Sequence, residues 1–145
     1  MLYLDTSALL KLYVLEQGSE FVQKKISSQN DPLPVWEIQE MELFNALQLK
    51  VFWNELSPTE IEHQLALFNQ RRDSGFYYTP EIRRAQLMNN FRKLSALTPE
   101  TGCRTMNVLH VAMACQLQAA EFISFDERQK KLAVMAGLDV PDISD

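Results

Sequence analysis

The sequence predicts an α/β fold in which a parallel sheet carries helices on both of its faces. Short apolar runs alternate along the chain with longer segments of helical periodicity, the order expected for parallel strands joined by crossover helices. The first run, Met1–Leu4, stops at Asp5, and a later run, Glu121–Phe125, stops at Asp126. A helical segment follows each aspartate, so the order strand, aspartate, helix occurs twice.

Periodicity and chain breakers set the expected elements in order. The expected strands are five short apolar runs: Met1–Leu4, Leu33–Trp36, Phe76–Tyr78, Glu121–Phe125 and Leu138–Val140. The expected helices repeat apolar residues at intervals of three and four and cover residues 6–13, 19–26, 37–52, 58–73, 79–97, 103–114 and 127–136. A polar break at 27–32 and a loop at 98–102 separate neighbouring elements.

Capping residues support several of these boundaries. Ser57 is a helix cap, with Pro58 at the first helical position and Glu60 where a capping box needs it. Ser19 caps the second helix in the same way. Gly137 follows the last helix, where a left-handed residue commonly ends one.

Composition limits the class of protein. With 145 residues, 46% of them hydrophobic, the chain is expected to form one domain over residues 1–145. No apolar run approaches the roughly 20 residues that span a bilayer, and no basic start or cleavage site precedes one, so we expect a cytoplasmic protein without a membrane segment. The net charge of −5 argues against a broad cationic surface for nucleic acid.

Three acidic residues are candidates for chemistry. Asp5 and Asp126 follow strands, and ligands of open α/β sheets bind at the carboxyl ends of strands. Glu42 lies four residues after Ile38 and four before Ala46, close to the apolar stripe of its helix. Each has a plainer explanation, because Asp5 can simply cap a helix and Glu42 can border the stripe and reach solvent. Together they predict a site for Mg²⁺ or Mn²⁺, the usual remedy for carboxylates gathered in a cleft.

Other chemistries lack their motifs. The four glycines are too scattered for a dinucleotide fingerprint or a phosphate loop, and no Gly-x-Ser-x-Gly elbow is present. Asp5 is not followed two residues later by the second aspartate of aspartyl-phosphate phosphatases. His63 lies in a charged helix and His110 in an apolar one, so zinc has no ligand cluster, and His110 is expected to be a packed or supporting residue.

Four segments together resemble the PIN-domain family, in particular the VapC-type toxin ribonucleases. They are Leu4–Leu10, Glu42–Leu47, Gly102–Ala112 and Phe125–Gln129. They occur in the family's order and extend over nearly the whole chain. The resemblance implies a three-layer α/β/α fold with a five-stranded parallel sheet, cleavage of RNA with Mg²⁺ or Mn²⁺, a homodimer, and a small antitoxin protein that threads the active-site cleft.

The resemblance also implies roles for individual residues. Asp5, Glu42 and Asp126 fall on three of the family's acidic metal positions. Asn107 stands where relatives usually have a fourth aspartate, so the site would have three formal negative charges in place of four. An amide oxygen can still coordinate a cation or hold water, but weaker metal binding and reduced activity are expected.

Supporting residues come from the same segments. Ser7 and Ser124 can donate hydrogen bonds that orient the carboxylates. Arg104, near a helix start, can either contact a substrate phosphate or pair with an acid. The arginines of the central third of the chain form either a solvated helix face or a contact with the RNA backbone.

The expected function is therefore that of a metal-dependent endoribonuclease, the toxin of a toxin–antitoxin pair, with Asp5, Glu42, Asn107 and Asp126 at the catalytic centre. The alternative is a catalytically attenuated PIN-like module that binds a protein partner or RNA. Exchange of Asn107 for aspartate separates the two.

Overall fold

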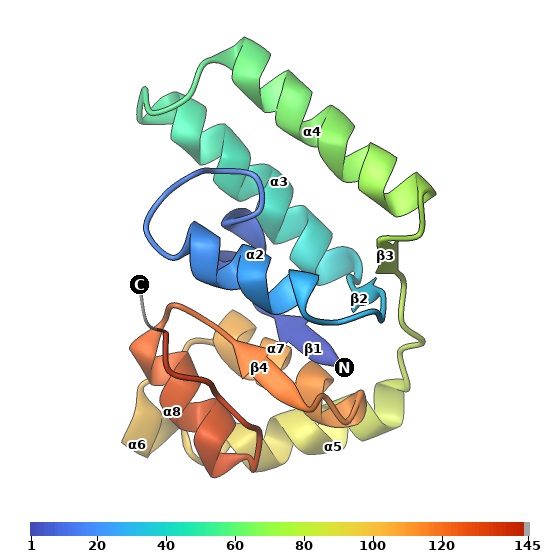
Figure 1. The fold of residues 1–145 in the computed structure, drawn as a ribbon. Helices are drawn as coiled ribbons and strands as arrows, with labels where there is room; N and C mark the ends of the chain where they lie inside the picture. Colours follow the sequence, from blue (N-terminus) through green and yellow to red (C-terminus); the bar gives the residue numbers. More distant parts are fainter. Residues whose placement is uncertain (144–145) are drawn as a thin grey trace.

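The computed structural model describes residues 1–143 and contains short parallel strands between two groups of helices (Figure 1). The strands are β1 (Leu2–Leu4), β2 (Leu33–Pro34), β3 (Tyr77–Tyr78) and β4 (Glu121–Ile123). The helices are α1 (Thr6–Leu10), α2 (Ser19–Ser27), α3 (Glu37–Phe52), α4 (Pro58–Asp73), α5 (Arg84–Ser95), α6 (Thr98–Thr101), α7 (Thr105–Gln116) and α8 (Glu127–Met135). No helix in the described part of the chain is long and apolar enough to cross a membrane.

All strand pairing among the described residues is parallel, as predicted, but the expected five-stranded sheet is wrong. β1 pairs with β4 and β2 pairs with β3, which makes two sheets of two strands each. The expected fifth strand, Leu138–Val140, contributes a single bridge between Asp139 and Glu121.

Missing or occupied hydrogen-bonding groups explain the short ladders. Pro34 ends β2 and Pro141 follows the bridging segment, and proline has no N–H to donate to a neighbouring strand. At the end of β1, the Gln39 side chain takes the Leu4 carbonyl through a 2.6 Å hydrogen bond from Nε2. Gln39 also accepts the Trp36 N–H at 3.0 Å, so it fastens the start of α3 to β1.

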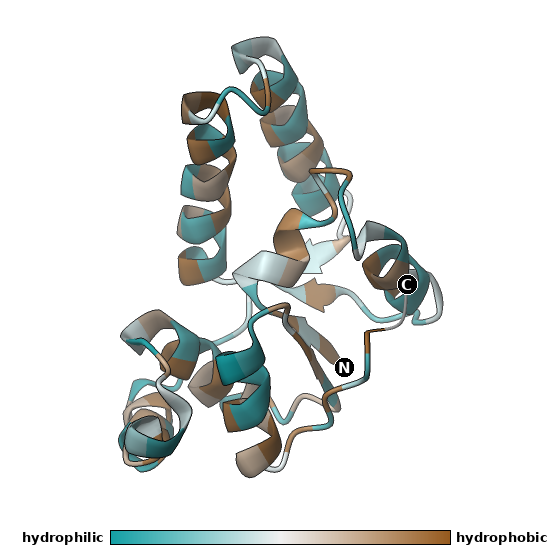
Figure 2. Ribbon diagram, turned by 90° about the vertical axis from the view of Figure 1, so that its left-hand side faces the viewer, coloured by the Kyte–Doolittle hydropathy of each residue, from teal (hydrophilic) through white to brown (hydrophobic). Residues whose placement is uncertain are grey.

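The side chains of β1 alternate between two hydrophobic clusters, one on each face of the strands. Leu2 and Leu4 belong to a cluster built with α1, α2, α3 and α4. Tyr3 belongs to a second cluster built with α5, α7 and α8. The first half of the chain thus covers one face and the second half covers the other, with hydrophobic strands between them (Figures 1 and 2). This arrangement confirms the prediction of helices on both faces.

Several predicted boundaries differ from the structure, three of them as follows. α5 begins at Arg84 rather than 79, because the Arg83 N–H donates to Oε1 of Gln116 at 3.0 Å and so does not lie inside a helix. The expected loop 98–102 contains the short helix α6, which ends at Gly102 with a left-handed φ of 67°. α7 begins at Thr105 rather than at Cys103, which is buried just before it.

Candidate active site at the carboxyl ends of β1 and β4

Asp5 follows β1 directly and is 5% exposed. Its backbone N–H donates to the Ile123 carbonyl at 3.0 Å, which extends the pairing with β4 by one residue. Its carboxylate Oδ1 accepts the Ala8 N–H at 2.8 Å and the Ser7 hydroxyl at 2.6 Å. Asp5 therefore caps α1, as one reading of the sequence required, and also lies at the edge of the strands, as the other required.

Ser124 links the two strand-end aspartates. Its fully buried hydroxyl lies 2.9 Å from Oδ2 of Asp5 and accepts the Asp126 N–H at 3.0 Å. Ser7 strengthens the link from the other side, because its hydroxyl accepts the Phe125 N–H at 2.9 Å. The hydroxyls of Ser7 and Ser124 thus both contact the Asp5 carboxylate.

Burial dominates the electrostatics of Asp5. Removal from solvent raises the pKa of its carboxyl, and the electrostatic effect of His110 together with the hydrogen bonds from Ser7, Ala8 and Ser124 offsets only part of this rise. A carboxylate held ionised here lacks enough compensation from the protein alone. Such a group gains from a cation or a proton.

Asp126 caps α8 and contacts Asn107. Its Oδ1 accepts the N–H groups of Arg128 and Gln129 at 2.9 and 3.1 Å. Its Oδ2 accepts a hydrogen bond from Nδ2 of Asn107 at 3.1 Å. The amide of Asn107 is thus oriented with its nitrogen toward Asp126, which leaves its oxygen without a protein donor among the described residues.

Glu42 lies on α3, and only one oxygen of its half-buried carboxylate has protein hydrogen-bond partners. Oε1 accepts the Thr6 hydroxyl at 2.8 Å and contacts Nε2 of His110. Burial raises the pKa of Glu42, but the hydrogen bonds from His110 and Thr6 outweigh it and hold the pKa below its ordinary value. No protein donor within residues 1–143 reaches Oε2. Every buried polar side-chain atom among these residues has a hydrogen-bond partner. Because Oε2 has none, it is not buried and is open to a ligand.

Two residues of this network were not singled out from the sequence. The Thr6 hydroxyl donates to the Glu42 carboxylate. Gln129 is fully buried on α8, and its Oε1 lies 2.7 Å from the Ser124 hydroxyl as a second acceptor for the hydroxyl proton. Gln129 lies three and four positions before the buried Leu132 and Ala133, on the same face of α8. A polar residue on this apolar face was the feature of the sequence that could have pointed to it. His110 was expected to be a packed or supporting residue and is both.

A hollow of about 490 Å³ opens beside Asn107 and Asp126, and Arg104 and Arg128 line it. Both arginine side chains are exposed, and neither makes an ion pair or a side-chain hydrogen bond with another described residue. Pairing of Arg104 with an acid, one of its two expected roles, is therefore not what the structure contains. Two unpaired guanidinium groups at this hollow suit an anionic ligand.

The arginines of α4 have local partners instead. Arg71 lies over the ring of Tyr13 with 5.0 Å from Cζ to the ring centroid, and Arg72 pairs with Glu40 at 2.6 Å. These contacts stay within the protein. For these two residues the structure favours the helix-face reading over contact with RNA.

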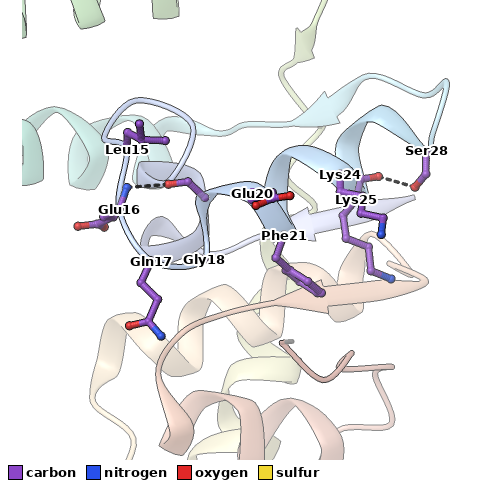
Figure 3. Close-up of a pocket in the computed structure, with 10 residues that line it drawn as sticks. Leu15, Glu16, Gln17, Gly18, Glu20, Phe21, Lys24, Lys25 and Ser28 are labelled. Atoms are coloured by element: carbon purple, nitrogen blue, oxygen red, sulfur yellow. Dashed lines mark hydrogen bonds between the residues drawn. The ribbon is translucent and has the colours of Figure 1, made fainter. Parts of the chain in front are cut away.

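A larger hollow of about 760 Å³ lies elsewhere, along α2 and the segment before it (Figure 3). Leu15 and Phe21 contribute apolar surface to it, and Lys24 and Lys25 contribute charge. None of the predicted site residues lines it. We place the candidate site at the strand ends, because buried polar side chains converge there and not in the larger hollow.

The three acids have oxygen atoms of the kind that Mg²⁺ binds, but they do not form a ready-made coordination site. In the part of the chain that the structure describes, no three histidine, cysteine, aspartate or glutamate side chains are close enough together to hold a metal. Carboxylate and amide oxygens are nevertheless the ligands of Mg²⁺, which keeps several waters and often takes only one or two carboxylates. Asp5, Glu42 and Asp126 therefore offer suitable ligand atoms along one edge.

Comparison with known proteins supports the fold. The structure is similar to that of FitAcB from Neisseria gonorrhoeae. The TM-score is 0.66 at 14% sequence identity, over 98% of this chain and 97% of the other. No family model and no curated protein matches the sequence. The similarity agrees with the PIN-like fold expected from the sequence, and at this identity it carries the fold alone.

Proposed function

We propose that this protein is a PIN-type endoribonuclease that depends on Mg²⁺ or Mn²⁺, and that it is the toxin of a toxin–antitoxin pair. The observation that carries the proposal is the Ser124 link, which joins Asp5 and Asp126 at the ends of two paired parallel strands. The motif resemblance and the fold similarity support the same class. A homodimer and a small antitoxin partner are proposed from the resemblance.

Different residues would bind the cation and the substrate. Asp5, Glu42 and Asp126 would share the binding of the ion, one or two of them by direct contact and the others through its bound waters, with the free oxygen of Asn107 beside them. A bound Mg²⁺ would neutralise these acids and lower the pKa of water for attack on a phosphodiester. The chain itself orients Asp5 through Ser7 and Ser124.

Substrate binding is assigned to the hollow lined by Asn107 and Asp126. The guanidinium groups of Arg104 and Arg128 make no ion pair or hydrogen bond with another described residue, and both residues line the same hollow as Asp126. Guanidinium groups there can hold the phosphates that flank the cleaved bond. No base-specific contact is proposed, so the site would select the RNA backbone rather than a sequence.

The direct test is cleavage of a labelled single-stranded RNA by the purified protein with Mn²⁺ or Mg²⁺. We expect Asp5→Asn, which preserves the helix cap, and excess chelator each to abolish cleavage, and Asp73→Asn, the same change at an exposed residue of α4, to leave it intact. Equal cleavage by Asp5→Asn and the unmodified chain would refute this assignment.

The alternative function, a PIN-like module with attenuated catalysis that binds a partner, draws on one observation: the Asn107 amide donates to Asp126 instead of adding a charge. Asn107→Asp restores a fourth carboxylate. A gain of tenfold or more in Mn²⁺ affinity and in cleavage rate would support attenuation, as measured by calorimetric titration and single-turnover cleavage. Robust cleavage by the native chain with no gain would exclude it.

A further inference from the structure

A chain of hydrogen bonds runs from the hydrophobic core to the Glu42 carboxylate. Nε1 of Trp36 donates to the Tyr3 hydroxyl oxygen at 2.9 Å. The same hydroxyl lies 3.0 Å from Nδ1 of His110, and Nε2 of His110 contacts Oε1 of Glu42. Trp36, Tyr3 and His110 are each at most 4% exposed, so water has little access to the first three members.

The direction of each bond follows from the donors available. An indole nitrogen only donates, so the Tyr3 oxygen accepts from Trp36, and its own proton has His110 as the one remaining partner among the described residues. A tyrosine hydroxyl, with an ordinary pKa of about 10, keeps its proton near neutral pH. Nδ1 of His110 is therefore the acceptor. The imidazole proton then lies on Nε2 and points at Glu42.

The opposite arrangement is less well satisfied. A proton on Nδ1 of His110 would donate to Tyr3 and leave the buried Tyr3 proton without an acceptor. A buried donor left unpaired costs about 1–3 kcal/mol. The geometry thus selects one imidazole tautomer.

We propose that His110 is a positioning residue for Glu42, and that Tyr3 and Trp36 fix the imidazole tautomer which this role requires. His110 and the Thr6 hydroxyl both contact Oε1 of Glu42 and leave Oε2 free for a ligand. A glutamate side chain otherwise loses substantial rotamer freedom when it is ordered on binding. His110 removes that cost in advance by holding Glu42 in a single orientation at the strand ends.

The tautomer can be measured without any assumption about activity. Nitrogen-15 NMR of the imidazole rings, in the full chain with chelator present, distinguishes a protonated Nε2 from a protonated Nδ1. The chain has two histidines, so a His63→Gln variant assigns the His110 signals. We expect a single tautomer, protonated at Nε2, for His110.

Tyr3→Phe removes the hydroxyl that selects this tautomer and should shift the His110 signals toward a mixture of the two forms. Tyr77→Phe is the matched control, because it removes another buried tyrosine hydroxyl, bonded to Tyr13 at 2.5 Å in the other hydrophobic cluster. It should leave His110 unchanged. Protonation of His110 at Nδ1 in the unmodified chain, or an unaltered spectrum in Tyr3→Phe, would overturn the proposal.

The consequence for ligand binding rests on the proposed function and is read separately. Loss of an orienting partner behind a metal ligand typically lowers metal affinity about 10- to 100-fold. We therefore expect Mn²⁺ affinity, by calorimetric titration, to fall at least tenfold in Tyr3→Phe and to be retained in Tyr77→Phe. A native chain that binds no Mn²⁺ would refute the proposed function, whereas the NMR result would still decide the role of His110.

Discussion

Replacement of Asp5 by asparagine should make the protein more stable while it abolishes cleavage. The Ser124 hydroxyl has one proton but faces two acceptors, Oδ2 of Asp5 at 2.9 Å and Oε1 of Gln129 at 2.7 Å. The Ser124 hydroxyl can therefore donate to only one of these two oxygens at a time, and the other then receives no hydrogen bond from it. An amide nitrogen in place of Oδ2 would donate to Ser124, whose own proton would then serve Gln129.

The expected gain combines two opposing effects. An unmade buried hydrogen bond costs about 1–3 kcal/mol, while the bonds from Ser7 and Ala8 lose the extra strength of a charged acceptor. We expect a net gain of about 1–2 kcal/mol for Asp5→Asn, or roughly 2–8 °C in melting temperature for a chain of this size. Calorimetry at pH 8 with chelator measures it, and Asp73→Asn controls for loss of an exposed charge.

The dependence on pH supplies the decisive check. Burial raises the pKa of Asp5 in the folded protein above its unfolded value, so the folded state holds the proton more tightly. Stability is then lost as pH rises from the ordinary aspartate pKa through the raised one. The advantage of Asp5→Asn should be largest at pH 8 and should shrink toward pH 4. A loss of stability at pH 8, or a difference independent of pH, would refute this reasoning.

Two further changes test the packing and the substrate hollow. Gly18→Ala should destabilise the protein by about 2–4 kcal/mol in urea unfolding, because the new Cβ would lie 2.3 Å from the Phe125 ring at a φ of 88°. Gly75→Ala, with a φ of 80° and no atom within 4 Å, should cost only the backbone strain of about 1 kcal/mol; equal losses would contradict the clash. Arg104→Ala combined with Arg128→Ala should weaken RNA binding about tenfold or more and flatten its salt dependence, as measured by fluorescence anisotropy at several salt concentrations. An unchanged salt slope would remove these arginines from the substrate site.

The sequence by itself determined the elements that depend on neighbouring residues. The bounds of α3 and α4 agree with the prediction, and the Ser57 hydroxyl caps α4 through the Glu60 N–H at 3.2 Å as the capping box required. Asp5 was placed at the end of its strand from a change in local pattern alone, and Asp126 was placed close to the end of its own, although β4 ends at Ile123 and not at Phe125 as predicted. Periodicity and caps involve residues a few positions apart, so the sequence displays them directly.

Only the tertiary structure decided which side chains meet. Contacts that define the site join residues far apart in the chain, 119 positions for Ser124 and Asp5 and 68 for His110 and Glu42. The start of α5 also moved because a distant glutamine, Gln116, takes the Arg83 N–H. The sequence names the polar residues available to the site, but a hydrogen bond between distant segments depends on how strands pair and helices pack. That pairing chose His110 as the partner of Glu42.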